Sequence, residues 1–315
     1  MTQHNKNRTN PTHPIQWNLK LLYESADDPQ IQQDLKDYSI KRAAFAEKYQ
    51  ERTDFLREEE ALYQALTEYE QLINDLNGAR PLMYFHYLTA INSDNTQAHA
   101  QLNKITNQLT KAYNQLTFFP IKLGKIDKAL QTKFLKSTKL ARYRYFLSKR
   151  FEHAEYDLKE EQEKILNLTD QTSHQMWVEG VNKAVNKLTV TWKGKKLPIS
   201  EAAQKIAQLP TKPRRELHQK LLKKLSTVKN FAETEINAVV TSKFIEDDLR
   251  GFKQPHQARF LGSQNDPDTV QLLIDTVSQN YQLAHRFYQA KAKLLHQAIK
   301  HKLFKKSAGC LGQAS

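Results

Sequence analysis

Glycine and proline are scarce in this chain, and that scarcity limits the folds open to it. Its 315 residues include only eight glycines and ten prolines, so few positions suit tight turns. A fold of many short strands needs frequent turns, whereas long helices need few connections. Because Leu, Ile, Phe and Tyr also recur every three or four residues, the sequence predicts an all-α fold of mostly long helices.

Two acid–proline sequences predict where helices begin. Asp28-Pro29 and Asp266-Pro267 each place a capping carboxylate before a proline in the first helical turn. We expect the second helix to run on towards Leu295. Apolar spacing predicts further helices beginning near Thr53, at Ser93 or Asp94, and near Leu158, with others over 126–150, 201–209, 212–226 and 230–249, the last capped by Gly251.

One stretch has the composition of strands. Residues 188–192, Leu-Thr-Val-Thr-Trp, are β-branched and aromatic, and Gly194 follows within a short basic segment. This pattern predicts a small β-hairpin near Thr189–Leu197. Ser200 is expected to cap the helix after it.

Charge and cysteine content limit the compartment and the partners. The net charge is +14, but the last 40 residues contribute +7 of it, so the rest is only mildly basic. The single cysteine, Cys310, excludes an internal disulfide and fits a reducing compartment. Residues 1–14 are polar, without the apolar run of a signal peptide or membrane span, and are expected to be a disordered leader. The sequence predicts a cytoplasmic protein with no membrane partner.

The chain contains no HExxH motif, the sequence that places two histidines and a glutamate around zinc on one helix. His285, His296 and His301 are the nearest candidates, but none are four residues apart. Glycine loops for phosphate and a GxSxG nucleophile turn are also absent. We therefore assign no catalytic, metal-binding or cofactor-binding residue to this chain.

Two charged segments could still form a site. Glu246-Asp247-Asp248 could be an acid–base or metal cluster, but a solvated helix end before Gly251 explains it more simply. Arg142–Phe151 interleaves basic and aromatic residues, as RNA-binding segments do. On a helix, however, Leu140, Tyr143 and Leu147 share one side, which favours a core helix with a basic outer face.

Several segments, taken in order, resemble the N-terminal part of the oligoendopeptidase F family, relatives of thimet oligopeptidase. The most specific is Tyr156–Leu166, Tyr-Asp-Leu-Lys-Glu-Glu-Gln-Glu-Lys-Ile-Leu, followed by Trp177. In it, Lys159 stands where the family usually has a serine cap. The other matching segments are Trp17–Tyr23, Asp27-Asp28-Pro29, Tyr69-Glu70, Tyr84–Leu88, Asn92–Asn95, Arg250-Gly251-Phe252 and the helix from Asp266 to Leu295.

The resemblance implies the front part of a helical, channel-type oligopeptidase fold. The intact family binds Zn²⁺ and hydrolyses short peptides, but its zinc-binding and catalytic positions lie in a second half that has no counterpart here. We expect no zinc bound by this chain. The expected division is a leader (1–14), an N-terminal helical domain (15–120), a second helical region that begins the peptidase domain (121–295) and a basic tail outside the family pattern (296–315).

Three functions follow as hypotheses. The first is a truncated or frameshifted zinc oligopeptidase, inactive as this chain. The second is a helical module that binds peptides or pairs with a separately encoded catalytic half. The third is RNA binding through 142–151 and the basic tail, although the sequence does not favour nucleic acid as a partner.

Overall fold

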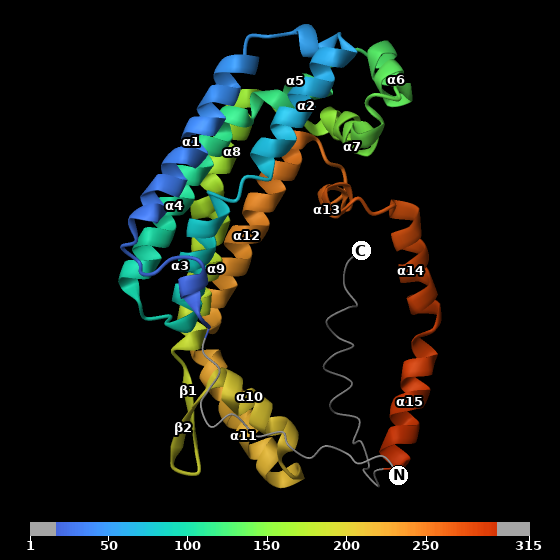
Figure 1. The fold of residues 1–315 in the computed structure, drawn as a ribbon. Coiled ribbons are helices and arrows are strands. Elements are labelled where there is room, and N and C mark those ends of the chain that lie inside the picture. Colours follow the sequence, from blue (N-terminus) through green and yellow to red (C-terminus); the bar gives the residue numbers. More distant parts are fainter. Residues whose placement is uncertain (1–16, 295–315) are drawn as a thin grey trace, which may run out of the picture. The chain divides into compact units, whose positions relative to one another are not determined.

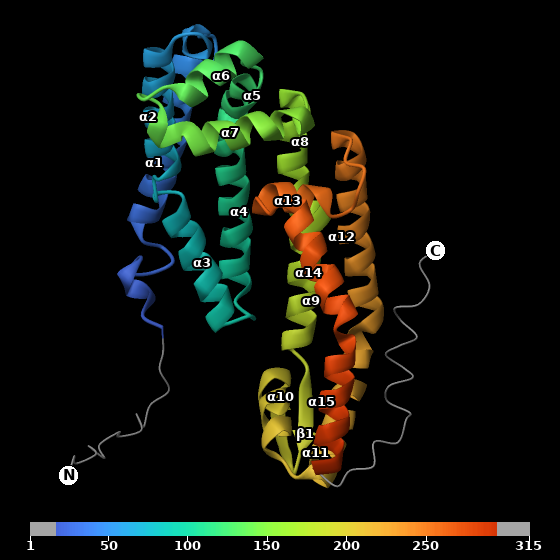
Figure 2. The ribbon, with the colours of Figure 1, turned by 90° about the vertical axis from the view of Figure 1, so that its right-hand side faces the viewer.

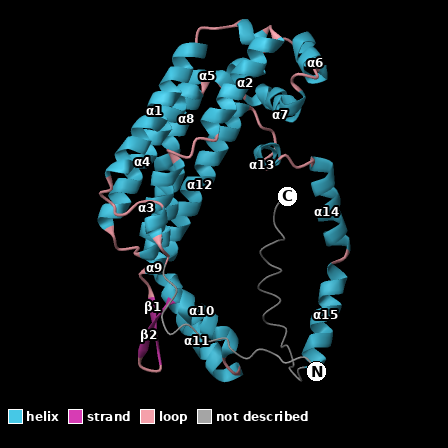
Figure 3. Ribbon diagram, in the orientation of Figure 1, coloured by secondary structure: helices cyan, strands magenta, loops and turns pink. Residues whose placement is uncertain are grey.

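The computed structural model describes residues 17–294, and these are almost entirely helical (Figures 1 and 3). The all-α prediction is confirmed, as is the hairpin, the only sheet among the described residues. The chain divides into two compact units, Met1–Phe252 and Lys253–Ser315, which are described separately. In the described part, no helix is long and apolar enough to cross a membrane.

The first unit contains twelve α-helices and two strands within its described residues. In chain order they are α1 (Pro29–Tyr49), α2 (Glu59–Ile73), α3 (Ala79–Ile91), α4 (Thr96–Tyr113), α5 (Phe118–Gly124), α6 (Lys128–Lys136), α7 (Arg144–His153), α8 (Glu160–Asp170), α9 (Met176–Asn186), β1 (Thr189–Trp192), β2 (Lys195–Pro198), α10 (Ile199–Gln208), α11 (Thr211–Leu225) and α12 (Lys229–Arg250). A π-helical turn, Gln171–Gln175, joins α8 to α9.

The largest core lies among α1, α2, α5, α6 and α7, and aromatic rings fill its centre. Phe119 is fully buried, and its ring centroid lies 5.1 Å from that of Phe45, 5.4 Å from Phe55 and 4.8 Å from Tyr69. Burying one such ring contributes about 2–3 kcal/mol. This cluster therefore anchors the upper end of the unit in Figure 1.

A second core joins the beginning of α1 to α3 and α4. It contains a buried polar contact, in which the Tyr23 hydroxyl donates to Asp34 at 2.6 Å. Gln30 and Arg80 also donate to this carboxylate, at 2.7 and 3.4 Å. Burial and the adjacent Asp34 raise the pKa of Tyr23 well above its ordinary range, so the hydroxyl keeps the proton that it donates.

Two close contacts attach the later helices to these cores. Asn114, at the end of α4, donates to the Lys164 carbonyl of α8 at 3.1 Å and accepts from Asn167 at 2.8 Å. At Gly124, a Cβ would lie 2.8 Å from Ala154 Cβ and 3.0 Å from the Asp157 carboxylate. The absence of a side chain there lets α5 approach the end of α7.

The hairpin and the two helices after it have a small core of their own. Val190, Trp192 and Leu197 are buried against Leu217 and Leu221 of α11. In the turn, Lys193 and Gly194 both have positive φ, 46° and 79°, the geometry that a two-residue hairpin turn requires. The predicted Ser200 cap is wrong, because Pro198 precedes α10 and no side chain caps it.

The single helix predicted over 126–150 is wrong, because α6 ends at Lys136 and α7 begins at Arg144. Ser137 interrupts it: its hydroxyl donates to Glu59 at 2.7 Å and accepts from the Leu140 N–H at 3.1 Å. A serine that bonds its own neighbouring backbone competes with continued helix.

The second unit consists, in its described part, of α13 (Gln257–Ser263), α14 (Pro267–Gln279) and α15 (Tyr281–Leu294). The predicted Asp266 cap is confirmed, since its carboxylate accepts from the Thr269 N–H at 3.0 Å. Asn280 interrupts the predicted helix, and its side chain donates to the Thr276 carbonyl at 2.7 Å. No side chain described in 253–294 is buried, so these helices lack a core of their own.

Candidate functional site

Helix α12 has an unusual distribution of side chains. It lies along α9 and the π-helical turn (Figures 1 and 2), with small or polar residues such as Ala232, Ala238 and Ser242 partly buried. Ile236, Val240 and Phe244, four residues apart and hence on one side, are 61%, 41% and 50% exposed. We call these three residues the outer stripe. An ordinary surface helix buries its large apolar residues, whereas α12 leaves these three exposed.

Other large apolar side chains near this helix are exposed too. Ile245 and Leu249 lie on its other flank, at 56% and 48%. On α8 and α9, Ile165, Leu168 and Met176 are 59%, 42% and 44% exposed. Single exposed apolar residues are common, but repeated exposure along one side of a helix is typical of a surface that packs against something else.

A network of charges fixes the end of α12 against α8. Arg250 donates to both oxygens of Glu163, at 2.6 and 2.8 Å, and to the Tyr156 carbonyl at 3.2 Å. It also donates to Glu246 at 2.9 Å. Burial alone would raise the pKa of Glu163, but the Arg250 hydrogen bonds hold that pKa below its ordinary value. The carboxylate is therefore charged at neutral pH and remains paired.

The helix then ends sharply. Gly251 is left-handed at φ 77°, and the Phe252 N–H donates to the Asp247 carbonyl at 2.9 Å, as the predicted glycine cap requires. The Phe252 ring stacks on Tyr156, with 4.5 Å between centroids. Near the other end of α12, Phe231 packs against Trp177, with centroids 6.4 Å apart. Both ends of α12 are thus held, while the outer stripe between them is exposed.

Of the predicted candidates, the acidic run is only partly as expected. Glu246 and Asp248 are exposed, but Asp247 is 7% exposed and pairs with Lys243. The interpretation as a wholly solvated helix end is therefore wrong for Asp247. Its side chain is buried, and Lys243, one turn earlier, neutralises it.

The segment Arg142–Phe151 is part of the core, as the sequence favoured. Leu140 and Leu147 are fully buried, and Tyr143 is nearly so. The basic side chains of this segment contact the protein itself: Arg142 pairs with Glu70, Arg144 donates to the Ser137 carbonyl, Lys149 pairs with Glu152 and Arg150 pairs with Asp157. This leaves little free positive charge for RNA.

Histidines do not gather into a site in the described part of the chain. His285 is exposed on α15, and His296 and His301 lie outside the described residues. His153 is half-buried beside Arg150, and burial, then the Arg150 charge, lower its pKa. Within residues 17–294, no group of His, Cys, Asp and Glu could hold a metal ion. The described residues therefore do not fit a zinc site.

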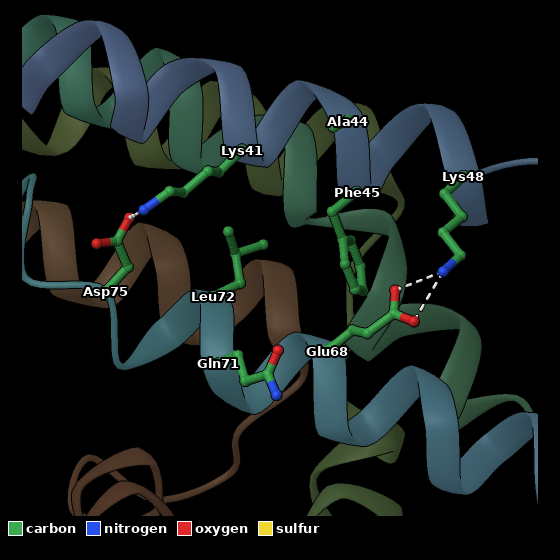
Figure 4. A pocket seen from close by; sticks show the side chains of 8 residues that line it. All are labelled: Lys41, Ala44, Phe45, Lys48, Glu68, Gln71, Leu72 and Asp75. Carbon is green, nitrogen blue, oxygen red and sulfur yellow. Dashed lines mark hydrogen bonds and ion pairs between the residues drawn. The ribbon is translucent and has the colours of Figure 1, made fainter. Parts of the chain in front are cut away.

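A hollow of about 430 Å³ lies between α1 and α2 (Figure 4). Its floor is formed by Phe45 and Leu72. An ion pair closes each end, Lys41 with Asp75 at 3.1 Å and Lys48 with Glu68 at 2.7 Å. Because each lysine lining it already has a carboxylate partner, this hollow offers a ligand no unpaired charge.

Comparison with known proteins gives the fold a context. Residues 122–180, which include Tyr156–Leu166 and Trp177, match the family model described as Oligopeptidase F. Oligoendopeptidase-F from Enterococcus faecium matches at a TM-score of 0.67 and 14% identity, over 85% of this chain and 54% of that one. A putative peptidase from Chlamydophila abortus matches at a TM-score of 0.57 and 19% identity, over 90% of this chain and 48% of that one. No curated protein matches by sequence.

The chain thus spans about half the length of either peptidase. The predicted resemblance to the N-terminal part of this family is confirmed by the segment that carries its most specific residues, and the helical fold by the structural match. The segments Tyr156–Leu166 and Arg250-Gly251-Phe252 were named separately from the sequence, but the bond between Arg250 and Glu163 was missed. The outer stripe was also missed, although the spacing of Ile236, Val240 and Phe244 could have revealed it.

Proposed function

Since this chain resembles the N-terminal part of the oligopeptidase F family, we propose that it forms the channel-wall half of such a peptidase. The observation that carries the proposal is the outer stripe of α12, Ile236, Val240 and Phe244, exposed on a chain that spans half of a solved oligoendopeptidase F. In this proposal the stripe packs against the metal-carrying half. Covering one half-exposed side chain of this size contributes about 1 kcal/mol.

The second unit supports the same proposal. On α14 and α15, side chains such as Leu273, Val277 and Phe287 are 61%, 48% and 60% exposed, and none of those described there is buried. Helices with an apolar stripe and no core need a surface to pack on. A further half of the peptidase would supply that surface.

We also propose that the chain alone does not cleave peptides. Zinc supplies this family's chemistry by making bound water a nucleophile at neutral pH. No HExxH motif occurs in the 315 residues, and the described residues offer no alternative cluster. In an assembled enzyme, this chain's part would be to shape the channel and admit short, unfolded peptides.

The catalytic half would come from a continuation of this chain, from a separately encoded chain, or from a reading frame that a frameshift divides from this one. Translation of the neighbouring DNA in all frames should reveal an HExxH-encoding segment, and its absence there would refute the frameshift.

The single cysteine favours a cytoplasmic site of action. The boundary proposed near residue 120 stays a prediction.

A peptidase assay tests the proposal directly. The purified chain, supplied with Zn²⁺ and a fluorogenic short peptide, should give no cleavage above background. Cleavage that a chelator abolishes would overturn the proposal that the chain is inactive alone.

The stripe has its own test. Ile236→Ser with Phe244→Ser should reduce binding of a dye that reports exposed apolar surface, while the midpoint of urea denaturation stays nearly unchanged. Ile91→Ser, at a 56% exposed position on α3, is the matched control and should affect the dye less. A marked loss of stability in the stripe variant would mean that these side chains are already covered, which contradicts a docking role.

A further inference from the structure

The positive charge of this protein is concentrated in the hairpin and the two helices after it. Residues 189–228, which we call the basic lobe, contain ten lysines and arginines against two glutamates, a net charge of +8. The last 40 residues carry +7, so the rest of the chain has a net charge of −1. Only the second of these two concentrations of charge was predicted from the sequence.

Few of the lobe's charges are neutralised within the protein. Lys220 pairs with Glu216 at 3.3 Å and lies 5.5 Å over the Trp192 ring. Lys223 and Lys224 are exposed, and neither forms an ion pair among the described residues. Neighbouring unpaired cations repel one another and raise the local concentration of anions.

These lysines surround a hollow. It has a volume of about 360 Å³, and its lining is Val190, Thr191, Lys220, Lys223, Lys224 and Thr227. One wall is therefore strand β1, and the other is the last two turns of α11 with the residues after them. Unlike the hollow of Figure 4, where each lysine has a carboxylate, this one has two lysines whose charge is unmatched.

Strand β1 also offers backbone groups. It pairs with β2 alone, from Thr189 opposite Pro198 to Trp192 opposite Lys195. Its other edge has no strand beside it in the described structure. An unpaired strand edge is a template for an extended peptide, whose main chain can continue the sheet.

We propose that the basic lobe binds acidic peptide segments in an extended conformation. The peptide backbone would lie along the open edge of β1, with its Asp or Glu side chains at Lys220, Lys223 and Lys224. This inference rests on the proposed function in one respect: it takes the ligand to be a peptide. It adds a preference for acidic sequences and a place where they bind before or during entry to the channel.

The lobe favours a peptide over single-stranded nucleic acid. Sequence-tolerant binding of single strands uses exposed aromatic rings on which bases stack. Trp192 is the only Phe, Trp or Tyr in residues 189–228, and it is 4% exposed. Lysine without an aromatic platform recognises charge alone, which suits carboxylates along an extended chain.

The test uses the full-length chain and fluorescence anisotropy. The probe is a labelled ten-residue peptide of alternating Asp and Val, compared with a Ser–Val peptide and a ten-nucleotide oligo-dT. The acidic peptide should bind at least about tenfold more tightly than the neutral one, and more weakly as salt rises from about 50 to about 200 mM. An acidic peptide N-methylated at alternate amides should bind more weakly, because it cannot pair fully with β1.

Charge reversal locates the site. Lys223→Glu with Lys224→Glu should weaken binding of the acidic peptide about tenfold or more. Lys133→Glu with Lys136→Glu, exposed positions on α6, makes the same change in net charge and should have little effect. Thermal melts verify that both variants fold.

Equal losses in the two variants would show that only net charge matters and would overturn the proposal. Tighter binding of oligo-dT than of the acidic peptide, lost in the lobe variant, would assign the lobe to nucleic acid instead. Binding is measured without cleavage and away from the outer stripe. The lobe can therefore fail this test while the channel-wall proposal stands, and the reverse also holds.

Discussion

Arg250 joins α12 to the rest of the first unit, and its replacement by methionine tests that role. The substitution keeps a long side chain but removes every hydrogen bond that the guanidinium donates: two to Glu163, one to Glu246 and one to the Tyr156 carbonyl. The side chains of Arg250 and Glu163 are only 18% and 16% exposed. Glu163 would thus be left largely buried without its cation.

The expected loss follows from that exposure. Removing one partner of a fully buried ion pair costs about 3–5 kcal/mol. Here both groups still touch solvent, and the Leu158 N–H continues to donate to Glu163 at 3.1 Å. We therefore expect Arg250→Met to lower the free energy of unfolding by about 2–3 kcal/mol, measured by urea denaturation followed by circular dichroism at pH 7.

The loss should depend on pH in a defined direction. In the native protein the pKa of Glu163 lies below its ordinary value of 4.5, so its pairing stabilises the fold fully above that pH and less as pH falls through the lowered pKa. In the variant, burial without Arg250 would raise that pKa, and protonation would relieve the penalty. The difference between the two proteins should therefore be largest near neutrality and shrink as the pH falls towards and below 4.5.

A double substitution separates the pair from its parts. Arg250→Met combined with Glu163→Leu leaves no buried charge unpaired, so it should be more stable than Arg250→Met alone. A loss below about 0.5 kcal/mol for Arg250→Met, or a loss that does not change between pH 7 and pH 4, would refute the reasoning.

Three other substitutions test single contacts. Gly124→Ala should lower the free energy of unfolding by about 1–3 kcal/mol in urea denaturation, because the new methyl group has no space against the end of α7. Lys193→Asn should raise the thermal midpoint slightly, because Asn adopts positive φ before Gly194 more readily than Lys does. Tyr23→Phe should cost about 1–2 kcal/mol and speed amide exchange early in α1, because buried Asp34 loses a donor.

Matched controls make these results interpretable. Gly262→Ala adds the same methyl group in α13, where no atom lies within 4 Å, and should be neutral or slightly stabilising. If it destabilises as much as Gly124→Ala, the steric argument is wrong. Tyr84→Phe removes another buried tyrosine hydroxyl, one that makes no hydrogen bond to a carboxylate among the described residues, and should cost less than Tyr23→Phe.

The parts of the fold predicted from sequence are those with local signals. Asp28 and Asp266 cap helices because their carboxylates reach backbone N–H groups two or three residues on, and Gly251 ends α12 because it adopts positive φ. Each of these helix ends depends on residues that are close together in the sequence, so the sequence alone predicts it. The break at Ser137 was missed because its hydroxyl also bonds Glu59, 78 residues earlier.

The candidate site was predictable only in part, and for the same reason. The Arg250–Glu163 pair spans 87 residues and exists only once α12 packs on α8, so no spacing rule indicates it. The outer stripe is different, because Ile236, Val240 and Phe244 follow a helical spacing that is plain in the sequence. What the sequence alone does not specify is which face of a helix the other helices cover.

The anchoring of α12 shows why its outer stripe matters for function. Arg250 and the stacked Phe252 hold one end of the helix, and Phe231 against Trp177 holds the region near the other. Between these ends Ala232, Ala238 and Ser242 are partly buried, and such small side chains let α12 pack close to α9. The stability of the first unit therefore does not account for Ile236, Val240 and Phe244, whose exposure costs free energy until another surface covers them. In the proposed function the metal-carrying half covers this face, which would explain both their size and their position.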